Sequence, residues 1–286
     1  MSAIALRVGG VPEHFNLPWH LAIEAGVPRD LGIDLTWRDY PDGSGAMAAA
    51  LRARELDAAL LLTEGAVAGA AGGGLQIASL YTDSSLIWGI HVPAGSRFRS
   101  VADVRGARYA ISRPGSGSHL MAFVHARAQG WPVEGLELVT VRNLAGAIEA
   151  FAAGTADVFF WEKFMTKPLV DDGRFWRVGE FLAPWPAFVL CVADSVDLPR
   201  RVALGRLLQA VLDQAGVLAA RPDAPKLIGS RYSLQPPDVA EWLKTTRWSR
   251  RVGIGADDLR SVTRALAELA LVPGGFDATQ KLVSLC

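Results

Sequence analysis

One short segment of the sequence combines residue types that bind anions in proteins. Ser112–His119 reads SRPGSGSH and lies between a predicted strand at 108–112 and a predicted helix at 118–129. Serine hydroxyls donate hydrogen bonds, glycine lets the backbone approach a ligand closely, and the first N–H groups of a helix attract anions. The alternative is an ordinary turn in which Ser118 only caps the helix. The residues predicted to bind a phosphate, sulfonate or carboxylate are Ser112, Ser116, Gly117, Ser118 and His119.

Two further segments with small or polar residues follow predicted strands. Asp42–Gly45 starts a predicted helix, and its Ser44 could bind a ligand or only cap that helix. Thr63 and Glu64 come directly after a predicted buried strand at 58–62. The Glu64 carboxylate would accept hydrogen bonds from an amino group or ring N–H of a ligand, or would only stabilise the start of the next helix. We therefore include Ser44, Thr63 and Glu64 among the candidate ligand-binding residues.

Aromatic residues near predicted strand ends could form an apolar wall beside a ligand. Trp161 and Glu162 end another predicted strand, so Trp161 could stack on a planar ligand while Glu162 binds its edge. Trp185 lies between two prolines, a pattern that predicts a rigid hinge or cleft wall. Asn16, the predicted cap of the first helix, and Trp19 within that helix are further candidates. The alternative is that these tryptophans are core residues and that Glu162 is solvated.

Several other chemistries lack the residues that they need. His14 and His20 are six residues apart, as are His119 and His125, whereas two metal ligands on one helix face are three or four apart. The sequence contains no G-x-S-x-G, H-E-x-x-H or C-x-x-C motif. Cys191, one of two cysteines, lies in an apolar run that predicts a buried thiol. We predict no metal site, no cofactor and no disulfide framework.

Composition and charge exclude several classes of protein. The chain has 286 residues, of which 50% are hydrophobic and 20% charged, so it can bury a substantial core. Lys plus Arg and Asp plus Glu both number 29, whereas a general nucleic-acid binder would show a basic excess, so we predict no nucleic-acid partner. The longest uncharged stretch, 65–82, is interrupted by three consecutive glycines, and we predict no membrane insertion. The first ten residues lack an export-signal pattern, which predicts a cytoplasmic protein, or an extracytoplasmic or periplasmic one if the sequence is a processed form.

The elements that must position these segments alternate between strands and helices. Such alternation is typical of an α/β fold. The predicted strands are 4–8, 33–37, 58–62, 76–81, 86–92, 108–112, 136–141, 158–161, 175–178 and 187–192. The predicted helices are 17–25, 43–54, 101–106, 118–129 and 144–153. After Pro199 the pattern is almost wholly helical, with apolar residues three and four apart.

Two regions about a hundred residues apart repeat one pattern. Residues 49–58 and 147–158 each predict a helix, a short turn, an aspartate and an apolar strand, with Asp57 and Asp157 at the strand entrances. Chance similarity is the alternative, because this succession is common in α/β proteins. In open α/β sheets, ligands bind beyond the carboxyl ends of the strands. Two similar halves would therefore bring the candidate segments to one cleft.

Four segments resemble parts of a known family. Gly10–Gly26, Gly43–Gly65, Ser112–Ala122 and Trp161–Trp185 resemble the periplasmic-binding-protein-like (type II) family of sulfonate, taurine, nitrate and thiamine-pyrimidine ABC-transporter substrate-binding proteins. The resemblance covers roughly residues 4–195. It implies an α/β, type II periplasmic-binding-protein fold with two α/β lobes, a ligand cleft between them and a helical C-terminal tail. It also implies that hinge motion closes the lobes on the ligand.

The resemblance further implies where the lobes begin and end. The chain would cross between lobes near 88–93 and near 189–194. Lobe 1 would then be discontinuous, with residues 1–90 plus 194–286, and lobe 2 would contain residues 91–193.

The resulting hypothesis is a solute-binding protein of the ABC-transporter substrate-binding type. It would clamp a small anionic or heteroaromatic, aminopyrimidine-like metabolite between two lobes, with an ABC permease as a further partner. We expect a binding protein rather than an enzyme. The alternative is a cytoplasmic enzyme on the same scaffold that uses Glu64, Glu162 or His119 as acid or base. A ligand-sensing domain of a larger regulatory complex is a third interpretation.

Overall fold

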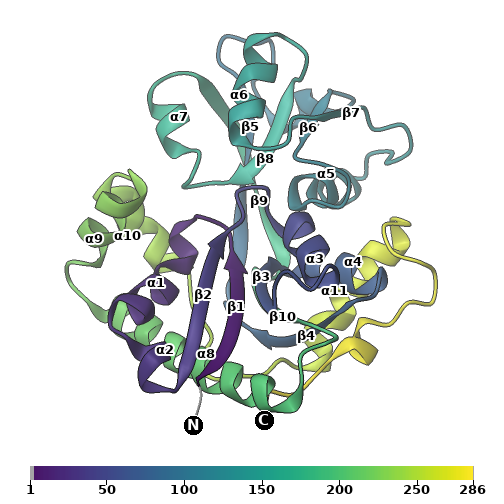
Figure 1. The fold of residues 1–286 in the computed structure, drawn as a ribbon. Coiled ribbons are helices and arrows are strands. Elements are labelled where there is room, and N and C mark those ends of the chain that lie inside the picture. The colour runs from purple at the N-terminus through teal and green to yellow at the C-terminus, as the bar shows by residue number, and fades with distance from the viewer. Residues whose placement is uncertain (1–2, 286) are drawn as a thin grey trace.

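The structure is a computed structural model that describes residues 3–285. Its strands form two five-stranded sheets, which lie one above the other in Figure 1. The first sheet has the order β2-β1-β3-β10-β4, with β1 (Ile4–Gly10), β2 (Ile33–Asp39), β3 (Ala58–Leu62), β4 (Leu75–Leu80) and β10 (Phe188–Ala193). The second has the order β7-β6-β8-β5-β9, with β5 (Ser85–Pro93), β6 (Tyr109–Ile111), β7 (Leu138–Thr140), β8 (Val158–Glu162) and β9 (Phe175–Pro186).

The two sheets repeat one arrangement. In the first sheet β1 pairs in parallel with β2 and β3, and in the second β6 pairs in parallel with β7 and β8. The fourth strand of each order, β10 or β5, runs antiparallel to both of its neighbours. The chain therefore contains two α/β lobes with equivalent sheet topology, as predicted.

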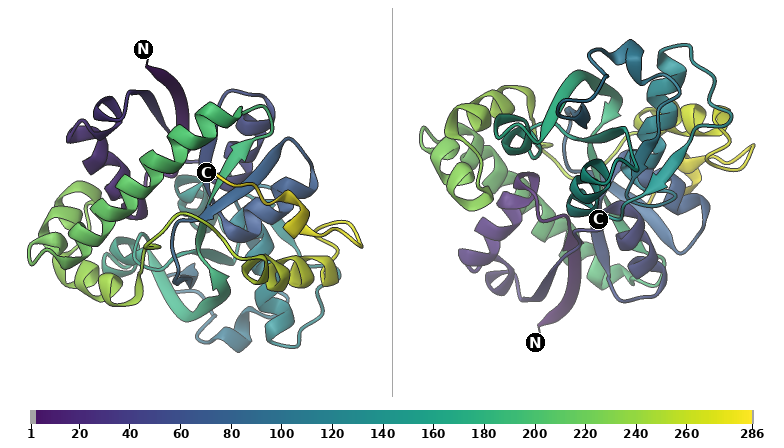
Figure 2. Two further views of the ribbon diagram at one scale, coloured as in Figure 1. Left: turned by 90° about the horizontal axis from the view of Figure 1, so that it is seen from below. Right: turned by 90° about the horizontal axis from the view of Figure 1, so that it is seen from above.

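Helices cover both sheets, and the C-terminal helices pack on the first lobe (Figure 2). The helices that lie between β1 and β9 in the sequence are α1 (Leu17–Glu24), α2 (Val27–Asp30), α3 (Ser44–Arg52), α4 (Thr63–Ala71), α5 (Gly117–Ala128), α6 (Leu144–Ala152) and α7 (Lys167–Asp171). The C-terminal helices are α8 (Leu198–Ala220), α9 (Ala224–Tyr232), α10 (Pro236–Thr245) and α11 (Ala256–Glu268). Three short 3₁₀ helices are η1 (His14–Asn16), η2 (Val101–Val104) and η3 (Ala278–Lys281). Helix α8 contacts α1 and β1, and α11 contacts α4.

Most predicted elements occur with their ends shifted by one or two residues, but β9 is much longer than predicted. It extends the predicted strand at 175–178 to Pro186, so Trp185 and its flanking prolines lie at the end of a strand, next to the point where the chain returns to the first sheet. Their role as a hinge or cleft wall stays a prediction. Strand β9 is at the edge of its sheet, where proline need not remove a hydrogen bond between strands. The helix predicted at 101–106 is only the 3₁₀ helix η2.

The repeated pattern of the sequence corresponds to a repeated set of hydrogen bonds. Asp57 accepts one from the backbone N–H of Arg7 at 2.8 Å and two from its guanidinium at 3.0 and 2.9 Å. Asp157 accepts the same three from Arg108 at 3.0, 2.8 and 2.8 Å. Each aspartate thus links the start of one strand, β3 or β8, to the neighbouring strand by hydrogen bonds.

The chain passes between the two sheets twice. It leaves the first sheet after β4 and returns to it at β10, so sheet membership changes at 81–84 and at Ala187. The predicted lobe limits, 1–90 plus 194–286 and 91–193, stay predictions, because sheet membership does not by itself define which parts move together.

Helix α8 belongs to the core of the first lobe. Leu204, Leu207, Leu208 and Val211 of this helix are completely buried. Within residues 3–285, α8 is the one helix whose length and hydropathy would suit a membrane span, and core helices of soluble proteins pass the same test. Cys191 in β10 is buried with a free thiol, as predicted.

Candidate functional site

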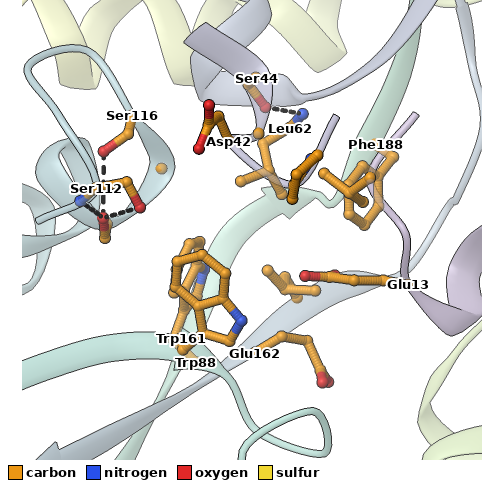
Figure 3. A pocket seen from close by; sticks show the side chains of 16 residues that line it. Glu13, Asp42, Ser44, Leu62, Trp88, Ser112, Ser116, Trp161, Glu162 and Phe188 are labelled. Carbon is orange, nitrogen blue, oxygen red and sulfur yellow. Dashed lines mark hydrogen bonds between the residues drawn. The ribbon is translucent and has the colours of Figure 1, made fainter. Parts of the chain in front are cut away.

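A pocket lies between the two lobes, where the carboxyl ends of strands from both sheets meet (Figure 3). Its volume is about 50 Å³, which leaves room for only a few water molecules. The residues that line it are Val11, Glu13, Pro41, Asp42, Gly43, Ser44, Leu62, Leu86, Trp88, Ser112, Ser116, Gly117, Ser118, Trp161, Glu162 and Phe188.

The first turn of α5 forms one side of the pocket. The Ser116 Oγ caps the helix by accepting a hydrogen bond from the N–H of His119 at 3.3 Å. The Ser118 Oγ accepts one from the N–H of Ser112 at 2.9 Å and lies 3.2 Å from the Ser116 Oγ. The N–H groups of Gly117 and Ser118 lie in the first turn, where a helix offers no acceptor of its own. This side therefore presents hydroxyl and N–H donors, the groups that bind an oxyanion.

Trp88 adds a further donor to the pocket. Its side chain is 3% exposed, and its Nε1 has no hydrogen-bond partner. The ring lies against α5, because a Cβ added at Gly117 would be 2.9 Å from it. A buried N–H without an acceptor costs about 1–3 kcal/mol, and an acceptor on a ligand would remove that cost. Trp161, which also lines the pocket, stacks on Phe159 with ring centroids 5.0 Å apart.

Ser44 joins two elements of the first lobe at the pocket. Its Oγ accepts a hydrogen bond from the N–H of Leu62 at 2.9 Å, which ties the start of α3 to the end of β3. A Cβ added at Gly65 would be 2.7 Å from the Ser44 Cβ, so α4 also packs closely against this point. The Ser44 hydroxyl thus has a fixed position in the pocket wall, with its hydrogen available to a ligand.

Two glutamates form the side opposite the serines. In Figure 3, Glu13 points into the pocket from the right and Glu162 lies below it, while the serines of the α5 turn are on the left. The Glu162 Oε2 accepts hydrogen bonds from the N–H groups of Phe164 at 2.9 Å and Met165 at 2.6 Å. Burial raises the pKa of Glu13 to about 7 and the pKa of Glu162 to about 8, and the charge of Glu13 adds to the second shift. These carboxyl groups can therefore hold or release a proton near neutral pH.

Contacts between the lobes surround the pocket. The Arg113 guanidinium of the second lobe donates hydrogen bonds to the carbonyl oxygens of Asp42 and Gly43 in the first. A Cβ added at Gly117 would be only 2.4 Å from the Leu62 Cδ1 of the first lobe. The lobes thus touch on two sides of the pocket, which accounts for its small volume.

The structure brings together predicted residues from three separate strand ends, those of β2, β6 and β8. Those that line the pocket are Ser44, Ser112, Ser116, Gly117, Ser118, Trp161 and Glu162.

Asn16 and Trp19 are outside the pocket lining. The Asn16 side chain is buried and its Nδ2 donates to the Val11 carbonyl at 2.8 Å, so it holds the loop after β1 and does not cap α1. Trp19 is completely buried, with its ring centroid 5.4 Å from that of Trp37. It is a core residue and forms no wall of this pocket.

Thr63, Glu64, Trp185 and His119 also lie outside the lining. The Thr63 Oγ1 donates to the Pro186 carbonyl at 2.6 Å. The buried Glu64 accepts a hydrogen bond from the Trp185 Nε1 at 2.8 Å. These two bonds join α4 to the end of β9. His119 faces its own loop, where its Nδ1 accepts from the N–H of Gly115 at 3.2 Å.

Several lining residues were absent from the sequence-based candidates. Glu13 and Asp42 follow β1 and β2 and lie in the segments 9–16 and 42–45, which the rule that ligands bind beyond strand ends does indicate, although neither residue was singled out. Leu86 and Trp88 lie within β5, and two-residue spacing does place them on one face of the sheet. The position of that face between the lobes follows only from the tertiary structure.

Comparison with known proteins identifies the fold. Residues 88–181 match the model of a family described as Ca3427-like periplasmic binding proteins. The Candida albicans CA3427 gene product, described as having the generic periplasmic binding protein fold, is similar with a TM-score of 0.89 and 23% identity over 98% of this chain and 96% of that one. The alkanesulfonate-binding protein SsuA of Xanthomonas axonopodis pv. citri, solved with MOPS, has a TM-score of 0.79 and 18% identity over 99% of both chains. The periplasmic aliphatic sulphonate binding protein SsuA of Escherichia coli has a TM-score of 0.69 and 18% identity over 99% of this chain and 92% of that one.

These similarities confirm the prediction of a type II periplasmic-binding-protein fold. The search of curated proteins found no match to this sequence. Among residues 3–285, no three His, Cys, Asp or Glu side chains come together in a way that could hold a metal ion.

Proposed function

We propose that this chain is a solute-binding protein that closes its two lobes around a small molecule carrying an oxyanion. The observation that carries the proposal is that Trp88, whose buried Nε1 lacks an acceptor, lines the same pocket as the serines of the α5 turn. Donors that converge on one interlobe pocket favour a negatively charged group over a neutral one. The periplasmic-binding-protein fold is consistent with this role.

Ligand binding would require the lobes to separate first. The pocket of about 50 Å³ is far smaller than an ordinary small-molecule site of roughly 300–1,000 Å³. We therefore propose that the ligand enters an open form and stabilises the closed one by touching both lobes. Ser44 would bind from the first lobe, and Ser116, Gly117 and Ser118 from the second.

The experiment is a screen of oxyanions by melting temperature and intrinsic fluorescence, with a matched pair of variants. Sulfonates, carboxylates and inorganic phosphate are the probes. An oxyanion that binds should raise the melting temperature, and Trp88→Phe, which keeps the ring and removes the N–H, should weaken its binding by roughly tenfold or more. Trp176→Phe is the control, because Trp176 is exposed on β9 and outside the pocket. If no oxyanion stabilises the protein, or if both variants bind it like the original chain, the proposed function is wrong.

The pairing with a permease is a separate part of the proposal. Some proteins of similar fold are described as components of ABC import systems, and an import role for this chain would place it outside the cytoplasm. The expectation of a cytoplasmic protein gains no support from neighbours described as periplasmic. Fractionation of the native host and co-purification with a membrane permease would test both points together.

One observation favours the enzymatic alternative as a second candidate. Glu13 and Glu162 have pKa values raised to about 7 and about 8, the range in which a carboxyl group can act as a general acid at neutral pH. Mass spectrometry of a bound oxyanion after long incubation would distinguish the two functions. An unchanged ligand supports binding alone, and a new product supports catalysis.

A further inference from the structure

The residues that line the pocket are unevenly charged. They include three acidic residues, Glu13, Asp42 and Glu162, and no lysine or arginine. In Figure 3 the two glutamates lie on one side of the pocket, and the serines lie on the other, with Asp42 between Ser116 and Ser44. A ligand that carried only negative charge would meet neutral donors at one end and carboxylates at the other, and like charges in a desolvated pocket repel strongly.

We infer that the ligand is a zwitterion, whose oxyanion binds at the serine side of the pocket and whose ammonium, amidinium or guanidinium group binds Glu13. This inference rests on the proposed function and specifies the class of ligand that the same pocket takes.

The serine side accounts for the negative end of such a ligand. The Trp88 indole is buried and its Nε1 has no partner, so this side has a donor in place for an acceptor that the chain does not supply. The N–H groups of Gly117 and Ser118 add the positive end of the α5 dipole. Neutral donors of this kind hold an oxyanion without neutralising it. The Arg113 guanidinium lies beside this side of the pocket, but the charge of Asp42 offsets it, so the compensating charge comes from the ligand itself or from solvent.

The side of the pocket that contains Glu13 would bind the positive end of such a ligand. Among residues 3–285, no side chain or backbone group forms a hydrogen bond or ion pair with the Glu13 carboxyl group, which points into the pocket in Figure 3. Glu162 differs, because the N–H groups of Phe164 and Met165 already bind its Oε2. Burial holds a proton on these carboxyl groups near neutral pH, and a cation would take the place of that proton. The indole rings of Trp88 and Trp161 lie between the two sides, where they can also attract a cation.

Calorimetric titration with matched pairs of sulfonates tests the inference. The pairs are aminoethanesulfonate with ethanesulfonate, aminopropanesulfonate with propanesulfonate, and guanidinoethanesulfonate with ethanesulfonate. In at least one pair the zwitterion should bind roughly tenfold or more tightly than the plain sulfonate. The plain sulfonate has no cationic group and so cannot form the charged hydrogen bond to Glu13. Glu13→Gln should abolish that preference and should tighten, not weaken, the binding of the plain sulfonate, because the variant lacks the carboxylate that repels an anion. Glu149→Gln, an exposed glutamate on α6, is the control and should keep the preference.

The outcomes separate this inference from the proposed function. Equal or tighter binding of the plain sulfonates, with Trp88→Phe weakening both members of a pair, overturns the zwitterion and leaves the oxyanion site intact. A preference for the zwitterion that survives in Glu13→Gln also overturns the inference, because another group would then bind the cation. If no member of any pair binds, the inference is wrong, and the proposed function is then decided by the carboxylates and phosphate of the melting-temperature screen.

Discussion

The Arg113 guanidinium in the second lobe donates a hydrogen bond to the backbone carbonyl of Asp42 in the first lobe. Arg113 is part of the glycine- and serine-rich loop before α5, and Asp42 precedes α3, so the bond joins the two loops that present the pocket serines. The lobes cannot separate without breaking it. The hydrogen bond from Arg113 therefore stabilises the closed form, and Arg113 is also a neighbour of the candidate anion site.

Arg113→Met should shift the ligand-free protein toward an open form. Methionine keeps an unbranched apolar side chain but removes the donors, and a hydrogen bond from a charged group contributes about 1.5–3 kcal/mol. Small-angle X-ray scattering should show a larger radius of gyration for Arg113→Met than for the original chain. Arg105→Met, at an exposed arginine of the same lobe, should leave the scattering unchanged. Identical curves for the two variants would show that this bond does not hold the lobes together.

Gly117→Val should block closure without unfolding either lobe. A Cβ at position 117 would lie 2.4 Å from the Leu62 Cδ1 across the pocket and 2.9 Å from the Trp88 ring. The collision with Leu62 occurs only in the closed form, because Leu62 belongs to the opposite lobe, whereas the Trp88 ring belongs to the same lobe and must shift in either form. Ligand binding, measured by intrinsic fluorescence, should fall by at least about tenfold if the closed form needs this contact.

The control for this variant is Gly216→Ala on the exposed face of α8, where an added Cβ meets nothing within 4 Å. It should bind ligand normally and stabilise the fold by about 0.5–1 kcal/mol, because alanine favours helix. Normal binding by Gly117→Val would contradict a pocket that closes in this way.

The alternation of strands and helices predicted an α/β protein and the repeated aspartate indicated two similar halves, whereas the type II periplasmic-binding-protein fold was predicted from the resemblance to a known family. Those features are local, because a strand of apolar residues such as 58–62 depends on neighbours in sequence. The glycine- and serine-rich loop was found for the same reason. Its composition and its place before a helix both indicate a binding turn. The cap of the helix that follows this loop was predicted at Ser118, and the structure has it at Ser116.

The remaining lining residues could not be predicted, because their role depends on the meeting of the two lobes. Trp88 lies in the middle of a strand, and nothing in its neighbouring sequence distinguishes it from a core tryptophan such as Trp19. Glu64 shows the converse error. It follows a strand, as a ligand-binding residue would, but the Trp185 Nε1 reaches it from β9, 121 residues away in sequence, and binds its carboxyl group. Long-range contacts of this kind leave no signal in the residues near them.

The buried Glu64 carboxyl group should make stability depend on pH. Burial raises its pKa from the ordinary 4.5 to about 7 in the folded protein. The folded state then binds the proton more tightly than the unfolded state, so stability falls as the pH rises from about 4.5 and levels off above about 7. The loss from this group is on the order of 1–3 kcal/mol. Glu64→Gln, which stays neutral, should reduce that loss in urea unfolding measured between pH 5 and pH 8.

Glu13 and Glu162 have raised pKa values as well, so Glu64→Gln should reduce the pH dependence and not abolish it. The exposed Glu149→Gln should leave the pH dependence as it is in the original chain. An unchanged slope in Glu64→Gln would mean that the Glu64 carboxyl group is ionised in the folded protein.

The two equivalent aspartates should differ in their contribution to stability. The Asp57 side chain is 5% exposed and also pairs with Arg200 at 3.3 Å, whereas the Asp157 side chain is 21% exposed and pairs with Arg108 alone. Removing one charge of a buried pair leaves its partner uncompensated, and screening by solvent reduces that cost at an exposed pair. Asp57→Asn should therefore lower the free energy of unfolding by about 2–4 kcal/mol and Asp157→Asn by about 1 kcal/mol, measured by urea denaturation at pH 7. Asp30→Asn, at an exposed residue of α2, should change it by less than about 0.5 kcal/mol. Equal losses for Asp57→Asn and Asp157→Asn would show that the shared hydrogen-bond pattern, and not burial, sets the contribution of each aspartate.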